Sequence, residues 1–542
     1  MSTQSPHKIA AALFCVFLPF YLLIFGGHTY SLDEEVLYYV TEGIVERGSP
    51  ALPPNNPDLP IGSSPTGVDG KTYAITGLAQ SVLAIPLYLV GRTIANLFPA
   101  PFHDYWTRFF VCTLNSFVTS AMVAAFYLFA RRLGFRQKTS LYLTISLGLA
   151  TILAVYARTF YTESLLTFWL LLAAGAAFLY KIESQARWAS VMGLALGLAA
   201  ATKIAALIVL PAFGLYLVLA WLRQPGQRRG AWTWRGLAAT ALGFAPPMLM
   251  VIIYNYVRFH SLFETGYHIT TETLTQTQSS LMVLYAFLFS SGRGIFAYSP
   301  PLILVVWSVG AALRRIRDET VLFLGICVVH LVFYANFRYW WGGGCWGPRY
   351  MVYITPFALL LCGALLEKTD IPRWVRVLGA VSLLAAGLAV NFSTLMVDYR
   401  RYVIWTEPFE HQMFYPSASP IVAQWNVWSR QFARLKQMNL DRLDPARPFY
   451  TLADGFNDIE APVLSPFGRW TKGPARLFIY AEPRQAATVH VAFSQSTQPG
   501  VPRDPPQFFL NGYRANGVPQ SLGRAGESDR WAVDLALPAQ WF

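Results

Sequence analysis

Long apolar segments recur over the first 396 residues of the chain, with shorter polar segments between them. A helix needs about 20 mostly apolar residues to cross the roughly 30 Å hydrocarbon core of a bilayer. About eleven segments approach this condition, at roughly 9–26, 108–130, 139–156, 163–180, 188–202, 204–222, 236–257, 297–313, 320–336, 350–366 and 375–395. We therefore predict a polytopic α-helical membrane protein with about eleven spans.

One further apolar segment does not fit the pattern of a lipid-facing span. Residues 77–98 contain Gln80, Pro86 and Arg92, which are costly in contact with lipid. Counting this segment as a span would also reverse the side on which every later loop lies. We expect a helix lying in the membrane interface instead, so that residues 27–105 form one large first outside loop with interfacial helices.

The pattern changes after residue 396, where hydrophobic runs shorten and prolines multiply. Four short segments alternate or carry β-forming residues with turn signals between them. They lie at 476–482, 487–494, 507–512 and 530–537. We therefore divide the chain into a membrane domain at 1–396, a linker with a helix around 420–440 at 397–445, and a small β-sandwich-like domain at 446–542.

Composition supports this fold class, because 54% of the residues are hydrophobic and only 13% are charged. The net charge is +13, and its distribution sets the topology. With the N-terminus in the cytoplasm, most basic residues before the last span fall in short inside loops, such as 131–138 and 314–317. This bias predicts N-in/C-out topology. It also argues against a nucleic-acid partner, because the basic residues are dispersed rather than gathered in a patch.

Three adjacent acids, Asp33, Glu34 and Glu35, follow directly after the first span. One interpretation is structural: Ser31 and Glu34 have the spacing of a capping box, and acids in a first helical turn are favoured by the helix dipole. The other is chemical. A carboxylate held at a helix start stays ionised, so Asp33 or Glu34 could accept a proton from a hydroxyl group.

The other outside loops carry cations and aromatic side chains. Cations and flexible glycine backbone suit a phosphate group, whereas Trp and Tyr suit a sugar face or the membrane interface. The candidates are Lys71, Arg158, Tyr161, Glu163, Arg293, Trp341, Trp346 and Arg349. Each also has a structural interpretation: a snorkelling lysine, an Arg158–Glu163 ion pair, a helix cap at Arg293, or an aromatic belt around 337–351.

Several stretches together resemble the GT-C glycosyltransferases, in particular the bacterial branch with the lipid A aminoarabinose transferases and protein O-mannosyltransferase-like enzymes. The resemblance covers roughly residues 8–395 and depends on order and topology rather than on one motif. It is carried by the acids after the first span and by GKTYAITGLAQSVLAIPLYL, YTESLLTFWLLLA, GLAAATK, SGRGIFAYSPP and WWGGGCWGPRYM.

The resemblance implies a polyprenyl-phosphate-sugar donor, an active site at the outer membrane face and a catalytic acid in the first outside loop. Asp33 matches that acid, with Glu34 beside it. Lys71, Arg293 and Arg349 match donor-phosphate ligands. The substrate-binding candidates are Arg158, Tyr161, Glu163, Trp341 and Trp346.

The predicted reaction is inverting transfer of a hexosyl or pentosyl group to an acceptor hydroxyl on a glycan, a lipid or a protein. The enzyme would lie in a bacterial cytoplasmic membrane, with its active site and C-terminal domain on the outer face. No cofactor is required, and a divalent metal held by Asp33 and Glu34 stays open. The alternative is a transporter or flippase of lipid-linked sugars, although the spans contain few mid-membrane ionisable residues besides His330.

Overall fold

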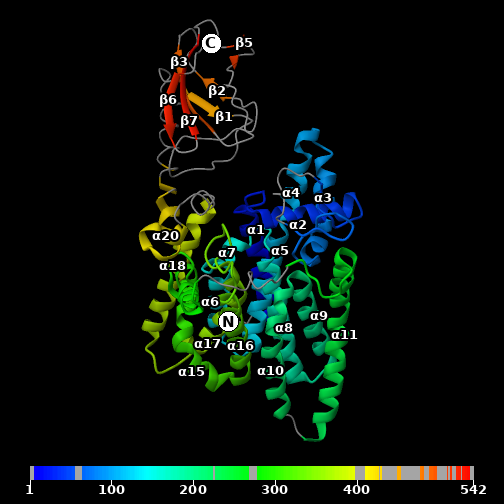
Figure 1. Cartoon of the computed structure of the whole chain (residues 1–542). Coiled ribbons are helices and arrows are strands. Elements are labelled where there is room, and N and C mark those ends of the chain that lie inside the picture. The colour runs from blue at the N-terminus through cyan, green and yellow to red at the C-terminus, as the bar shows by residue number, and fades with distance from the viewer. Residues whose placement is uncertain are drawn as a thin grey trace. The chain divides into compact units, whose positions relative to one another are not determined.

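The structure is a computed structural model of the whole chain (Figure 1). It describes residues 5–54, 64–223, 226–267, 278–396, 399, 409–426, 428–429 and 432, together with seven strands in the C-terminal part. The chain forms two compact units. The first comprises residues 1–403 and 407–424, and the second comprises 404–406 and 425–542.

Within its described residues, the first unit consists mainly of helices, with two isolated β-bridges, Ala51 to Tyr73 and Thr66 to Thr72, in the loop before α3. Its α-helices are α1 (Pro6–Leu23), α2 (Leu32–Glu46), α3 (Ala79–Ala95), α4 (His103–Cys112), α5 (Leu114–Arg132), α6 (Gln137–Leu149), α7 (Leu153–Tyr156), α8 (Glu163–Glu183), α9 (Ala186–Thr202), α10 (Leu210–Leu222), α11 (Gly226–Phe259), α13 (Ser280–Phe289), α14 (Ile295–Tyr298), α15 (Val305–Arg315), α16 (Arg317–Ala335), α17 (Thr355–Leu366), α18 (Arg373–Met396) and α20 (Phe409–Phe414). Short 3₁₀ segments include η2 (Ile204–Val209), η3 (Pro300–Leu304) and η4 (Arg349–Ile354).

Within the described residues, 8 helical segments are long and apolar enough to cross a membrane. They are Pro6–Leu23, His103–Arg132, Glu163–Glu183, Ile204–Leu222, Thr233–Phe259, Arg317–Ala335, Arg349–Leu366 and Arg373–Thr394. The predicted number of eleven is therefore not confirmed. Two of the other predicted spans form shorter helices, α6 with 13 residues and α9 with 17. The third, 297–313, is broken where Pro300 and Pro301 begin η3, because proline interrupts helical hydrogen bonding.

Many large apolar side chains on these helices face outward. Leu242 on α11, Val328 on α16 and Val381 on α18 are more than half exposed. Such surfaces would be unfavourable in water but suit contact with lipid chains. The first unit is therefore a membrane-embedded helical domain.

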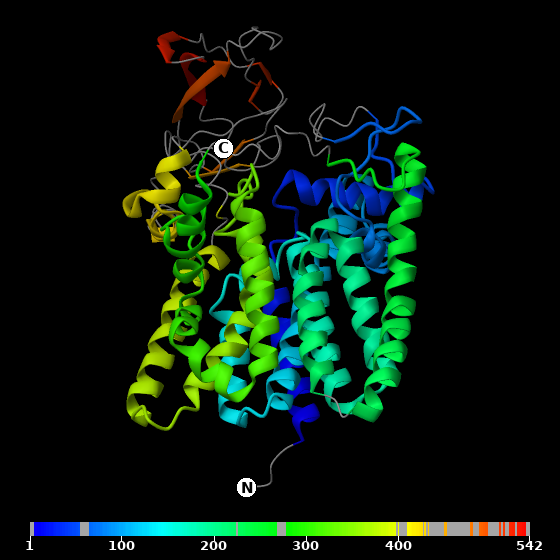
Figure 2. The same cartoon turned by 60° about the horizontal axis from the view of Figure 1, so that its bottom comes forward.

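Helix α9 packs along both α8 and α11, and Figures 1 and 2 show these three helices side by side. Small residues allow the close approach of α9 and α11. A Cβ atom added at Gly193 of α9 would lie 2.0 Å from the carbonyl oxygen of Thr240, and one added at Gly243 of α11 would lie 2.0 Å from that of Ser190. Close backbone contact of this kind is a common way of joining helices in membranes.

Replacing Gly193 with valine should therefore separate α9 from α11 and lower the free energy of unfolding by about 1–3 kcal/mol. The matched control is Gly214→Val on α10, where an added Cβ meets nothing within 4 Å. Thermal unfolding of the purified variants in detergent measures the difference. Equal unfolding temperatures for the two variants would contradict this packing.

Helices α2, α3 and α4 lie together beyond one end of the long helices (Figures 1 and 2). Buried polar contacts attach them there. The hydroxyl group of Ser81 on α3 donates to the carbonyl oxygen of Leu37 on α2 at 2.9 Å, and Tyr38 on α2 contacts Asp104 and Thr107 on α4. The predicted helix at 77–98 is thus present as α3. Its placement in a membrane interface stays a prediction.

The second unit contains β1 (Phe449–Leu452), β2 (Leu477–Tyr480), β3 (Ala487–Ser496), β4 (Phe509–Leu510), β5 (Tyr513–Arg514), β6 (Gln520–Ala525) and β7 (Ser528–Leu537). All pairings are antiparallel: β1 with β2, β4 with β5, and β7 between β3 and β6. A β-sandwich-like domain stays a prediction, because most residues that join these strands lie outside the described part of the chain.

Candidate active site

Helix α2 begins as its sequence predicts. Ser31 is the N-cap residue, with extended φ and ψ angles of −156° and 165°, and its hydroxyl oxygen accepts the backbone N–H of Glu34. At the other end, Gly48 has a φ of +60°, which favours glycine over other residues. The cap fixes the direction of the first turn, where Asp33 and Glu34 point to different partners.

Asp33 reaches a residue that is far away in the sequence. Nη1 of Arg349, at the start of η4, donates to Oδ2 of Asp33 at 2.6 Å. The Asp33 side chain is still 48% exposed, whereas that of Arg349 is only 9% exposed. Arg349 therefore holds a partly accessible carboxylate from the buried side.

Arg349 also joins Asp33 to a second acid. Its Nε donates to Oε1 of Glu163, the first residue of α8, at 2.7 Å. The same oxygen accepts the hydroxyl group of Tyr353 at 3.2 Å and lies 3.6 Å from Nζ of Lys203, directly after α9. We call Asp33, Glu163, Lys203 and Arg349 the central charge cluster.

The central charge cluster contains two carboxylates and two cations, so its formal charges balance. The Glu163 side chain is 0% exposed, which makes this balance necessary because an unpaired buried charge is costly. Burial raises the pKa of Asp33, but Arg349 and, more weakly, Lys203 outweigh it and hold the pKa below its usual range. Asp33 is therefore an ionised carboxylate at neutral pH.

Aromatic side chains lie against the two cations of the cluster. The Arg349 guanidinium lies 4.1 Å from the ring centroid of Tyr161, and the Lys203 ammonium lies 4.9 Å from that of Tyr350. Burial and the nearby Asp33 carboxylate raise the pKa of Tyr267 well above its usual value. The Tyr161 and Tyr350 rings shield the two cations from water, which strengthens the charge interactions of those cations.

Glu34 has a different environment from Asp33. It is fully buried, and its Oε2 accepts the backbone N–H of Phe160 at 2.7 Å. Phe160 belongs to the turn between α7 and α8, which also carries Arg158 and Tyr161 and leads into Glu163. Glu34 thus positions this turn against the start of α2, so Asp33 is the better candidate for contact with a substrate.

Replacing Glu34 with alanine should lower the free energy of unfolding by about 1–3 kcal/mol, because the Phe160 N–H would be left buried without an acceptor. Glu34→Gln keeps an acceptor oxygen and should restore most of that loss. Thermal unfolding of both variants in detergent provides the comparison. If the two variants lose equal stability, the hydrogen bond to Phe160 does not explain the role of Glu34.

Lys71 lies in the loop before α3 and forms an ion pair with Asp69 at 3.3 Å. Its side chain is 60% exposed, and no contact in the described part of the chain joins it to the central charge cluster. Its role as a phosphate ligand stays a prediction.

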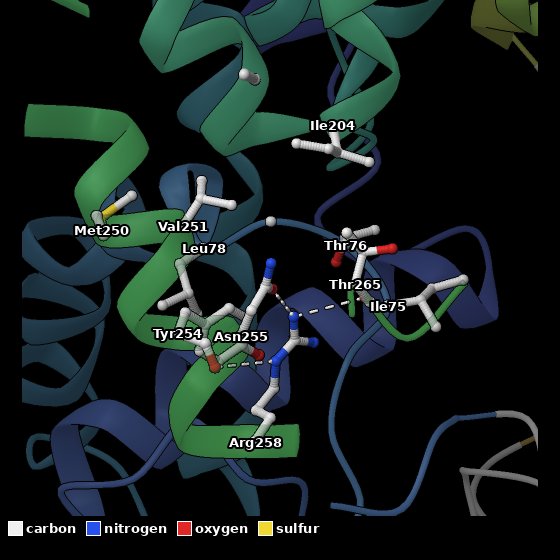
Figure 3. A pocket seen from close by; sticks show the side chains of 12 residues that line it. Ile75, Thr76, Leu78, Ile204, Met250, Val251, Tyr254, Asn255, Arg258 and Thr265 are labelled. Atoms are coloured by element: carbon white, nitrogen blue, oxygen red, sulfur yellow. Dashed lines mark hydrogen bonds between the residues drawn. The ribbon is translucent and has the colours of Figure 1, made fainter. Parts of the chain in front are cut away.

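Arg258 attaches the same loop to the end of α11. It donates to the carbonyl oxygen of Ala74 at 2.6 Å and to Oδ1 of Asn255 at 2.7 Å. Figure 3 shows the small hollow around this contact, with the Arg258 guanidinium pointing toward Asn255 and Thr265. Its volume of about 20 Å³ leaves room for about one water molecule and excludes a sugar.

Arg293 and the Gly-rich segment after α16 contact each other. Nε of Arg293 donates to the carbonyl oxygen of Trp341 at 3.0 Å, and Nη2 donates to that of Gly343 at 3.1 Å. Arg293 is buried, so these contacts favour a role in shaping the segment. Trp346 is also fully buried, and its ring centroid lies 5.0 Å from that of Tyr298. This packing favours a role in the core.

Arg158 lies in the turn between α7 and α8 and is 3% exposed. Its guanidinium carbon lies 5.4 Å from the ring centroid of Tyr30. The predicted Arg158–Glu163 ion pair is not among the contacts of the described residues. Instead, Glu163 binds Arg349 and Lys203.

The side chains of Asp33 and Glu34 have different partners. Asp33 contacts Arg349, whereas Glu34 contacts the Phe160 N–H and the Ser31 hydroxyl group. Among the described residues, no group of three His, Cys, Asp or Glu side chains could hold a metal ion. We therefore derive no step through a metal, and the expectation that no cofactor is needed stays a prediction.

Two members of the site were missed by reasoning from the sequence. Lys203 ends the GLAAATK stretch, and Tyr353 follows Arg349 by one helical turn. A lysine at the end of an apolar segment, on the same predicted side as Asp33, is the signal that could have identified Lys203.

Comparison with protein families defines the class of protein that the chain resembles. The family model of the dolichyl-phosphate-mannose-protein mannosyltransferases matches residues 76–263. This match confirms the predicted resemblance to GT-C glycosyltransferases over that segment, which includes α3 to α11 with Glu163 and Lys203. It supports a membrane glycosyltransferase that uses a lipid-linked sugar.

Two particular solved structures are also similar. They are those of ArnT from Cupriavidus metallidurans, one bound to undecaprenyl phosphate and one in the apo state. Each is 15% identical and covers 73% of this chain and 68% of the other, with TM-scores of 0.49 and 0.48. No match was found among curated proteins.

Proposed function

We propose that the protein transfers a sugar from a polyprenyl-phosphate carrier to an acceptor hydroxyl group at the outer face of the cytoplasmic membrane, with inversion at the anomeric carbon. The observation that carries this proposal is the central charge cluster. An ionised, half-exposed carboxylate is held by a buried arginine where several helix ends meet. A cluster built only for stability would not need to leave one acid accessible.

The reaction requires one proton transfer and one displacement. Asp33 accepts the proton of the acceptor hydroxyl group, and the hydroxyl oxygen forms a bond to the anomeric carbon. The bond from that carbon to the phosphate oxygen breaks, and its electron pair leaves with the polyprenyl phosphate. Arg349 orients Asp33 throughout and, with Lys203, supplies positive charge close to the developing anion.

Charge at the two ends of the helices supports the outer-face location. Helix α8 has 21 residues and is about 31 Å long, so Lys181 near its end lies far from Glu163 at its start. Lys181 and Arg223 both form ion pairs with Asp318 at that far end. Basic residues are enriched on the cytoplasmic side of membrane proteins, which favours an outer location for the Asp33 end.

The pKa of Asp33 makes the pH dependence a specific prediction. Because the Arg349 guanidinium holds this pKa below its usual value, the carboxylate form persists as the pH falls through the neutral and mildly acidic range. The transfer rate should therefore show no acidic limb between pH 8 and 5, when measured at saturating donor. An acidic limb near pH 6 would contradict Asp33 as the base in this environment.

The test of the function is identification of the product in proteoliposomes. The purified protein is supplied with a radiolabelled polyprenyl-phosphate sugar and an envelope glycolipid or glycan fraction as acceptor. A transferase moves the label from the polyprenyl phosphate to the acceptor. A flippase would leave the labelled sugar on its lipid and only change the leaflet in which it lies.

A further inference from the structure

Arg158 differs from the other cations of the site in its lack of a polar partner. Its Nε and Nη2 atoms are buried and form no hydrogen bond. Lys71 contacts Asp69, Arg293 contacts backbone carbonyl groups, and Arg349 and Lys203 share Glu163. Each of the other four cations has an acid or a backbone carbonyl group as a polar partner. The Nε and Nη2 atoms of Arg158 have neither.

This arrangement is costly unless an anion completes it. A guanidinium group stays protonated in proteins, so Arg158 cannot avoid the cost of burial by losing its charge. The nearby Tyr30 ring, which stacks on Tyr399 at 6.0 Å, offers only its face. Nε and Nη2 form one edge of the guanidinium fork, and such an edge matches two oxygens of a phosphate or carboxylate group.

The same turn carries another buried polar atom without a partner. It is Oγ1 of Thr162, a hydroxyl group that can donate a hydrogen bond to an oxyanion. Native proteins leave few such atoms, and a group of them marks a place where water or a ligand completes the hydrogen bonding. The turn is also tied to the start of α2 through Glu34 and Phe160, so it lies beside the helix that carries Asp33.

We propose that the Nε–Nη2 edge of Arg158 is the binding site for a phosphate-class oxyanion of the substrate. The anion would accept hydrogen bonds from Arg158 and from the Thr162 hydroxyl group and neutralise the buried charge of Arg158. If the anion is the phosphate of the lipid carrier, this inference depends on the proposed function. An anionic acceptor or free phosphate offers the same chemistry, and the experiment separates the lipid carrier from these other sources.

The experiment measures ligand binding and stability of full-length protein in nanodiscs. The probes are a polyprenyl monophosphate without sugar, the corresponding polyprenol and inorganic phosphate. The variants are Arg158→Met and Arg158→Lys. The control is Arg92→Gln, which removes a half-exposed cation of α3 that contacts Glu46 at 3.4 Å.

Arg158→Met should bind polyprenyl phosphate about 10- to 100-fold more weakly than the wild type, because charge-assisted hydrogen bonds are lost. Its affinity for polyprenol should not change, and Arg158→Lys should recover part of the loss. The empty Arg158→Met protein should unfold at the same temperature as the wild type or a higher one, because an unpartnered buried charge is gone. Arg92→Gln should match the wild type.

The remaining outcomes also decide the question. A loss confined to inorganic phosphate would support the anion site and assign it to a source other than the lipid carrier. Unchanged affinity for both phosphates, or an empty Arg158→Met protein that is less stable than the wild type, would overturn the proposal. Absence of sugar transfer by the wild type would instead reject the proposed function, and the binding result would stand.

Discussion

Replacing Asp33 with asparagine is expected to lower the rate of sugar transfer by about 10²- to 10⁴-fold, the usual contribution of a general base. Asparagine has nearly the same shape and keeps an oxygen that Arg349 can bind, so the fold should persist. It cannot take the proton of the acceptor hydroxyl group at neutral pH. The measurement is the initial rate of label transfer in proteoliposomes at saturating donor.

The matched control for this variant is Glu42→Gln on the same helix. Glu42 forms an exposed ion pair with Arg47 at 3.0 Å and lies outside the central charge cluster. Loss of such a pair costs little, so transfer should stay close to the wild-type rate. Wild-type activity in Asp33→Asn would show that Asp33 is not the base, even if the cluster itself is essential.

The second large effect concerns Glu163 and Arg349. Removing one partner of a buried ion pair leaves an uncompensated charge and typically costs about 3–5 kcal/mol. We expect Glu163→Gln and Arg349→Gln each to lose stability of this order. The double variant should lose less than the sum, because it removes both charges together and avoids part of the penalty.

The free energies of unfolding for this double-mutant cycle can be measured by denaturant titration in detergent. The exposed pair between Glu183, at the opposite end of α8, and Arg187, in the first turn of α9, serves as the control cycle, with an expected coupling below about 1 kcal/mol. All variants of Glu163 or Arg349 should also lose transfer, because Asp33 loses its orientation. If the stability losses of Glu163→Gln and Arg349→Gln add up exactly in the double variant, the two residues do not form a coupled buried pair.

Local chemistry made part of the site predictable. The Ser31 cap, the start of α2 and its end before Gly48 follow from side chains within one or two helical turns. Topology then placed Asp33, Glu163 and Arg349 on one side of the membrane domain. Their contacts confirm that the three residues meet, although no local pattern specifies which atoms pair.

The remaining differences arise from contacts between distant segments. Arg158 and Glu163 are close in sequence, but Glu163 forms its ion pairs with Arg349 and Lys203, which come from distant segments. Arg293 carries a charge suited to phosphate, yet the carbonyl groups of the Gly-rich segment take up its donors. Hydrophobicity likewise indicated a continuous span at 297–313, whereas Pro300 and Pro301 divide it.

The most direct test of the account is the anomeric configuration of the product formed by the purified protein from a polyprenyl-phosphate sugar of known configuration. Nuclear magnetic resonance of the isolated product distinguishes the two anomers. Direct displacement assisted by Asp33 predicts the opposite configuration to that of the donor. A product with the donor's configuration, or a sugar that remains on its lipid phosphate, would contradict the central claim.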